Sequence, residues 1–182
     1  MKPLSRRLLL AAGPAALAAP AVASRPLRGW KLGKPMPDFA YRGLVGGRRF
    51  LSDGRGKVRL VVFWGSWCGP CQTEMPRLDA LWRQWRDDRR VDALALSVNE
   101  TLTRSVDWIE SRNLALPAYE PDRADGWTLR LADGDNAPIG GTPTGFLVDE
   151  RGIIQFKRVG GGPIEPYEVR LRGLVERLIR IT

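Results

Sequence analysis

The sequence predicts an α/β fold in which helices flank a central mixed β-sheet, with a β-hairpin extension on its N-terminal side. Apolar runs typical of strands alternate along the chain with segments of helical spacing, which is the pattern of an α/β sandwich. A hydrophobic fraction of 43% is enough to fill a core, so wholesale disorder is excluded. The length of 182 residues fits one domain preceded by a leader.

Residues 1–23 have the three-part pattern of a secretory signal peptide. A basic start is followed by the uncharged residues 8–23, which are mostly Leu and Ala and end in the small-residue cleavage site Ala-Val-Ala. The pair Arg6-Arg7 fits either a twin-arginine signal or an ordinary basic start. The apolar run is shorter than the roughly 20 residues of a spanning helix, so a cleaved signal is favoured over a retained membrane anchor.

The predicted helices and strands of the mature chain rest on the spacing of apolar residues and on the prolines and glycines that interrupt regular structure. Residues 24–37 are expected to be an extended segment interrupted by three prolines, and residues 38–182 to form the domain. Residues 39–51 predict a hairpin that turns at a Gly-Gly pair. The nearly continuous apolar run at 58–64 suits a buried, parallel strand.

The rest of the chain continues this alternation. Residues 70–86 carry apolar side chains at helical spacing, with a kink expected at Pro76. The further elements are a strand at 91–98, a helix at 104–113 with Thr103 as its N-cap, a strand at 114–119, a short helix near 125–131, strands at 144–149 and 153–159, and an amphipathic helix at 166–181.

The chemistry is concentrated in Trp67-Cys68-Gly69-Pro70-Cys71, between the buried strand and the following helix. Unpaired N–H groups at a helix start favour negative charge, so the pKa of Cys68 should lie below the free value of about 8.5. Cys71 lies one turn later and can close a ring with it. Pro70 fits the first helical turn, and Gly69 lets a partner chain approach the sulfur. The motif predicts a dithiol–disulfide pair that exchanges through a mixed disulfide.

Composition argues against other kinds of site. The chain has no His, which excludes Ser-His and Cys-His catalysis and His-ligated metals. One CxxC gives two metal ligands, and a copper chaperone would need a third soft ligand such as Met36 or Met75, so no metal and no cofactor is expected. A purely structural disulfide is the remaining alternative, but so short a loop gains little entropy from closure.

The charge of the chain does not indicate nucleic acid. Loss of residues 1–23 lowers the net charge from +9 to +6, and no run of Lys and Arg exceeds two residues. We therefore expect no nucleic-acid partner.

Three stretches of the chain resemble a known family. Residues 61–71 (VVFWGSWCGPC) are similar to the thioredoxin superfamily, and residues 72–76 (QTEMP) and 33–39 (GKPMPDF) resemble its exported TlpA/ResA-like branch. The resemblance covers roughly residues 33–180 and implies a thioredoxin fold. It also implies that Cys68 is the nucleophile and that Cys71 resolves the mixed disulfide.

The resemblance points to further site residues. Thr142-Pro143 matches the cis-proline that faces the CxxC in the family and pairs with an extended substrate, although a trans proline at a strand start is the alternative. Trp67 would flank the docking surface. Thioredoxins have a buried Asp where this chain has Val62, whereas the ResA-like branch has a Glu at the position of Glu74. A buried Glu74 would have a raised pKa and could accept a proton, and the alternative is a solvent-facing helix residue.

The function implied is that of a periplasmic thiol–disulfide oxidoreductase, most simply a monomeric reductase fed by a membrane-embedded thiol donor. Its substrates would be exported proteins with cysteine pairs or disulfides, such as apocytochrome c or a factor that assembles the copper site of cytochrome oxidase. A broad-specificity oxidase or isomerase and a redox-gated binding or chaperone module remain as alternatives.

Overall fold

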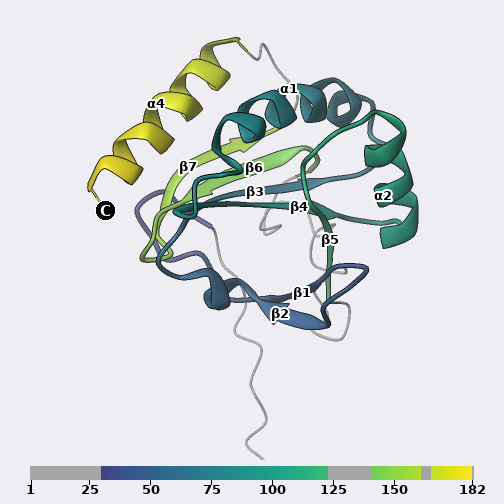
Figure 1. Cartoon of the computed structure of the whole chain (residues 1–182), viewed down its shortest axis with the longest axis horizontal. Coiled ribbons are helices and arrows are strands. Elements are labelled where there is room, and N and C mark those ends of the chain that lie inside the picture. The colour runs from purple at the N-terminus through teal and green to yellow at the C-terminus, as the bar shows by residue number, and fades with distance from the viewer. Residues whose placement is uncertain (1–29, 123–140, 161–164, 182) are drawn as a thin grey trace, which may run out of the picture.

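The computed structural model describes residues 30–122, 141–160 and 165–181, with only the backbone described at 165–167 and 181 (Figure 1). One seven-stranded sheet has the strand order β2-β1-β5-β4-β3-β6-β7. The elements are β1 (Ala40–Arg42), β2 (Arg48–Phe50), the 3-10 helix η1 (Leu51–Gly54), β3 (Val58–Trp64), α1 (Gly69–Trp85), β4 (Val91–Ser97), α2 (Leu102–Ser111), β5 (Ala118–Pro121), β6 (Thr144–Val148), β7 (Ile154–Val159) and α4 (Glu165–Ile181).

The sheet is mixed, and the fully buried strand β3 lies inside it, between β4 and β6. β3 runs parallel to β4 and antiparallel to β6, while β1 and β2 form the antiparallel hairpin. This confirms the predicted fold class, the hairpin and the buried parallel strand.

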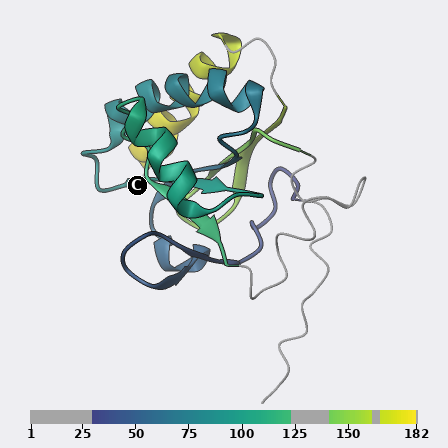
Figure 2. The same ribbon diagram turned by 90° about the vertical axis from the view of Figure 1, so that its right-hand side faces the viewer.

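The two faces of β3 belong to two separate cores. Val62 and Trp64 belong to the core that includes residues of α1, α2 and α4, and Val61 and Phe63 belong to the core that includes Trp30 and residues of the hairpin. Figures 1 and 2 show α1 and the hairpin on different sides of β3. Alternation along β3 thus gives the strand apolar side chains on both faces.

The segment before the hairpin is tied to the far edge of the sheet. Trp30 is only 2% exposed, and its ring packs against Phe39, Phe63 and Phe146. The N–H of Gly33 donates to the carbonyl of Ile154 in β7 at 2.8 Å. The described part of the expected extended segment therefore contributes to the second core.

Three expectations need correction or lie outside the described residues. The N-cap of α2 is Thr101 and not Thr103, because the Thr101 side chain accepts from the N–H of Arg104. The expected strand at 114–119 is instead β5, which begins at Ala118. The short helix expected near 125–131 lies outside the described residues.

The helix α1 runs through Pro76 as one continuous element. The closing helix α4 buries Leu171 and Val175 against the helix-covered core, as its amphipathic pattern predicts. Within the described ranges, no helix is both long and apolar enough to cross a membrane.

Candidate active site

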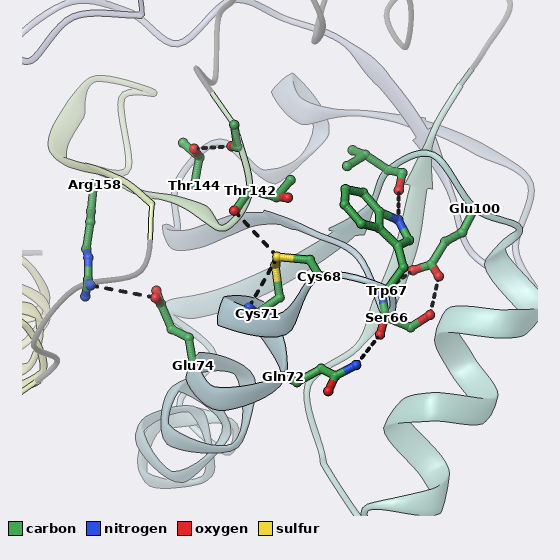
Figure 3. The surroundings of a disulfide bond; sticks show 12 residues. Ser66, Trp67, Cys68, Cys71, Gln72, Glu74, Glu100, Thr142, Thr144 and Arg158 are labelled. Atoms are coloured by element: carbon green, nitrogen blue, oxygen red, sulfur yellow. Dashed lines mark hydrogen bonds and ion pairs between the residues drawn. A yellow bond between two sulfur atoms is a disulfide. The ribbon is translucent and has the colours of Figure 1, made fainter.

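The two cysteines lie where β3 ends and α1 begins, and they are joined in a disulfide (Figure 3). Cys68 is the N-cap of α1, and its Sγ accepts from the N–H of Cys71 at 3.3 Å. Pro70 occupies the first turn, where a missing N–H costs nothing. Cys68 retains 5% exposure whereas Cys71 has none, so an incoming partner can reach only the first sulfur.

The loop before β6 faces this sulfur. The Thr142–Pro143 peptide bond is cis, and the carbonyl oxygen of Thr142 lies 3.5 Å from Sγ of Cys68. The Thr144 hydroxyl donates to the carbonyl of Gly141 at 2.6 Å, and the N–H of Gly160 donates to that of Pro143 at 2.8 Å. These bonds fix the loop to the ends of β6 and β7, opposite the disulfide.

Trp67 forms an aromatic surface beside the disulfide. The residue is 48% exposed, and its Nε1–H donates to the carbonyl of Val98 at 3.1 Å. A Cβ at Gly65 would come within 2.5 Å of this Nε1, so the ring folds back onto the glycine. The orientation of Trp67 therefore depends on a glycine two residues earlier.

Ser66 is held by a buried carboxylate that the sequence reasoning missed. Glu100 follows β4 and accepts from the N–H of Ser66 at 2.8 Å and from its hydroxyl. The amide of Gln72 donates to the carbonyl of Ser66 at 2.7 Å (Figure 3). The order of the strands could have indicated this contact. The neighbouring parallel strands β3 and β4 end at the same edge of the sheet, so the residues that follow them lie close together.

Glu74 lies one turn after Cys71 and is buried, with a side-chain exposure of 2%. Burial raises the pKa of this carboxyl, the guanidinium of Arg158 opposes that rise, and Glu168 adds to it. Oε2 of Glu74 lies 3.9 Å from Nη2 of Arg158 on β7. Of the two alternatives for Glu74, the structure supports the buried residue.

Comparison with known proteins assigns the chain to a family. Residues 32–157 match the family described as AhpC/TSA. The chain belongs to the AhpC/TSA family. Thiol-disulfide oxidoreductase ResA of Geobacillus kaustophilus (strain HTA426) is 34% identical over 143 residues, which is 79% of this chain and 78% of the relative. ResA of a Bacillus cereus strain is 28% identical over 148 residues, 81% of this chain and 79% of the relative.

Solved structures agree with the fold of this AhpC/TSA-family chain. The thioredoxin domain of a thiol-disulfide oxidoreductase from Bacteroides vulgatus has a TM-score of 0.64 at 24% identity, covering 81% of this chain and 96% of that one. A thiol:disulfide interchange protein from Chlorobium tepidum has a TM-score of 0.62 at 21% identity, covering 81% and 97%. The protein is a thiol-disulfide oxidoreductase of ResA type with a thioredoxin-like fold, and its redox pair is Cys68–Cys71.

The structure brings most of the expected site residues of this oxidoreductase together. Trp67, Gly69 and Pro70 surround the disulfide on the loop and first turn of α1, and Thr142 and Pro143 face it from the loop before β6. Glu74 points away from the disulfide toward Arg158 (Figure 3). Arg158 and Glu100 are additions to the predicted set of site residues.

Proposed function

We propose that the protein is an exported protein-disulfide reductase in which Cys68 attacks and Cys71 resolves. The observation that carries this assignment is the asymmetry of the pair. Cys68 lies at the helix N-terminus with a small exposed surface and faces the cis-proline loop, whereas Cys71 is completely buried behind it. A helix N-terminus stabilises a thiolate, which is the attacking species.

The exchange starts from the reduced pair. The Cys68 thiolate attacks a partner disulfide, a Cys68–partner bond forms, and the second partner sulfur leaves as a thiolate that takes a proton from water. Cys71 then loses its proton and attacks Sγ of Cys68, which restores the Cys68–Cys71 disulfide and releases the first partner sulfur. Two electrons pass to the partner, and a membrane-embedded thiol donor returns them.

The groove around Cys68 would take the partner as an extended strand. The backbone of Thr142, on the N-terminal side of the cis bond to Pro143, would pair with such a strand. A Cβ placed at Gly69 would meet no atom within 4 Å, so the side of the motif that faces outward is open to an approaching chain. The exposed ring of Trp67 supplies an apolar contact.

Glu74 is the proposed acceptor of the Cys71 proton. It lies at i+3 from Cys71 on α1, it is buried, and burial raises its pKa above the ordinary value of a carboxyl group. Val62 stands where thioredoxins carry their buried Asp, and its apolar side chain cannot take a proton.

The compartment and partners follow from the leader and from the ResA relatives. Residues 1–23 support export, and we place the reaction in the periplasm, with a cleaved signal and a monomeric domain of residues 38–182 after the segment 24–37. The substrates are specific exported proteins with cysteine pairs or disulfides, such as apocytochrome c or an assembly factor for the copper site of cytochrome oxidase.

Trapping tests the proposal directly. Cys71→Ser should accumulate mixed disulfides with exported partners that a reductant releases, because the bond to Cys68 cannot be resolved. Cys68→Ser, which has the same loss of one thiol, should accumulate none. Absence of any exported partner on Cys71→Ser would refute catalytic exchange.

The direction of exchange has its own measurement. We expect a reduction potential nearer the roughly −270 mV of thioredoxin than the roughly −120 mV of the oxidant DsbA. A value close to the second figure would leave the exchange chemistry intact but make the protein an oxidase.

A further inference from the structure

A buried ion pair connects the helix of the redox motif to the edge strand β7. Nη2 of Arg158 lies 3.9 Å from Oε2 of Glu74, and their side chains are 14% and 2% exposed (Figure 3). Among the described residues, Oε2 has no hydrogen-bond partner. The guanidinium is thus the charge that compensates this carboxylate where water cannot.

The spacing of the pair suits a group that must gain and lose a proton. A carboxylate in a close, bidentate pair with Arg holds its charge strongly and makes a poor acceptor. A lone buried carboxylate would instead stay protonated and could accept nothing. Because Nη2 of Arg158 lies 3.9 Å from Oε2 of Glu74, beyond hydrogen-bond distance, the guanidinium favours the ionised form of Glu74 but does not fix it.

The charged groups that act on Glu74 come from two packed elements. Arg158 on β7 lowers the pKa of the carboxyl, and Glu168 on α4 raises it together with burial. Burial is the largest influence and it raises the pKa of this carboxyl, so removal of Arg158 would raise that pKa further.

We propose that Arg158 is a positioning residue for the thiol chemistry, whose guanidinium holds the Glu74 carboxylate ready to take the Cys71 proton during resolution of the mixed disulfide. The proton leaves Sγ of Cys71 as the new sulfur–sulfur bond forms and reaches the carboxylate through water, because the Glu74 side chain points away from the disulfide toward Arg158 (Figure 3). The inference rests on the proposed role of Glu74, but not on the direction of exchange or on the partner.

The test separates the two steps of exchange. Reduced protein is mixed with one equivalent of 5,5′-dithiobis(2-nitrobenzoate), whose first thiolate is released by attack of Cys68 and whose second is released by Cys71. The rate of the second release is followed from pH 4 to pH 9. The first release serves as an internal reference for access to Cys68.

We expect the pH profile of the second thiolate release to shift, and that of the first release to stay unchanged. Arg158→Gln should move the midpoint of its pH profile upward by about one unit, which is a fall of up to about tenfold in rate below the midpoint. Arg158→Lys should restore most of the shift, because the cation is kept. Arg172→Gln, which removes the same charge from an exposed position on α4, should leave the profile unchanged.

A double-substitution cycle identifies the route of the effect. In a Glu74→Gln background, Arg158→Gln should produce no further shift. An equal shift in that background would mean that Arg158 acts directly on the thiols, and an unshifted midpoint in Arg158→Gln would also overturn the proposal. A second release without pH dependence in the unsubstituted protein would remove both residues from the mechanism, while trapping by Cys71→Ser would still report the exchange itself.

Discussion

Replacing Glu100 by Ala tests whether a buried carboxylate supports the loop before Cys68. The side chain of Glu100 is 2% exposed and accepts from both the N–H and the hydroxyl of Ser66. Arg104 lies 3.9 Å away but is 68% exposed, so water screens most of its contribution. The substitution therefore removes two buried hydrogen bonds and leaves two buried donors on Ser66.

The magnitude follows from these bonds. A hydrogen bond to a charged group contributes about 1.5–3 kcal/mol net, and removal of the buried charge offsets part of the loss. We expect the free energy of unfolding of Glu100→Ala to fall by about 2–4 kcal/mol. Glu100→Gln is the matched variant, because one amide oxygen still accepts from the N–H and the amide nitrogen can donate to the hydroxyl. Its loss should be about 1 kcal/mol.

Urea denaturation of the oxidised protein measures both variants, with an unchanged m-value as the check that unfolding stays comparable. The exchange rate of the reduced protein reports whether Cys68 is still held in place. If the free energy of unfolding of Glu100→Ala lay within about 0.5 kcal/mol of that of the unsubstituted protein, the substitution would have no larger effect than an ordinary surface change. That result would refute the view that this carboxylate supports the loop.

Two further substitutions test burial near the disulfide. Because the folded pKa of Glu74 is raised above its ordinary value of 4.5, the folded state keeps this proton to higher pH than the unfolded chain, so the unfolding free energy should fall as pH rises through the folded pKa. In Glu74→Gln, the unfolding free energy measured by denaturation at several pH values should no longer fall in this way. If the fall persisted, another titrating group would be its cause. Gly65→Ala should lower the unfolding free energy by about 1–3 kcal/mol, because its Cβ would press on Trp67. Gly69→Ala, with open space at its Cβ, is the control and should change it by about 0.5 kcal/mol or less; equal losses would contradict the packing argument.

The elements that sequence predicted well are those with strong local signals. The nearly continuous apolar run of β3 and the helical spacing of α1 each identify an element without reference to the rest of the chain. The CxxC motif lies between them, so its position at a helix N-terminus was also predictable. The cis-proline at Thr142–Pro143 was predicted from resemblance, since local sequence allows either isomer.

The features that sequence missed depend on contacts between distant segments. Thr101 and Thr103 are equally suited to cap a helix by type, and only the observed start of α2 at Leu102 selects the first. Trp30 lies among breakers in the sequence, yet its ring fills the second core. Arg158 looks like a solvent-facing residue of an edge strand until Glu74 is placed beside it.

Glu74, the proposed proton acceptor, lies at a position where a positively charged side chain can compensate its carboxylate. Val62 pairs with Ala95 and Gly145 in the middle of the sheet, and its side chain faces a core made of apolar residues. Burial among those apolar residues would disfavour the ionised form of a carboxyl group there. Glu74 lies instead on the side of α1 that β7 approaches, where Arg158 can compensate its charge. A buried acidic residue near Cys71 can therefore ionise more readily on helix α1, at position 74, than on strand β3, at position 62.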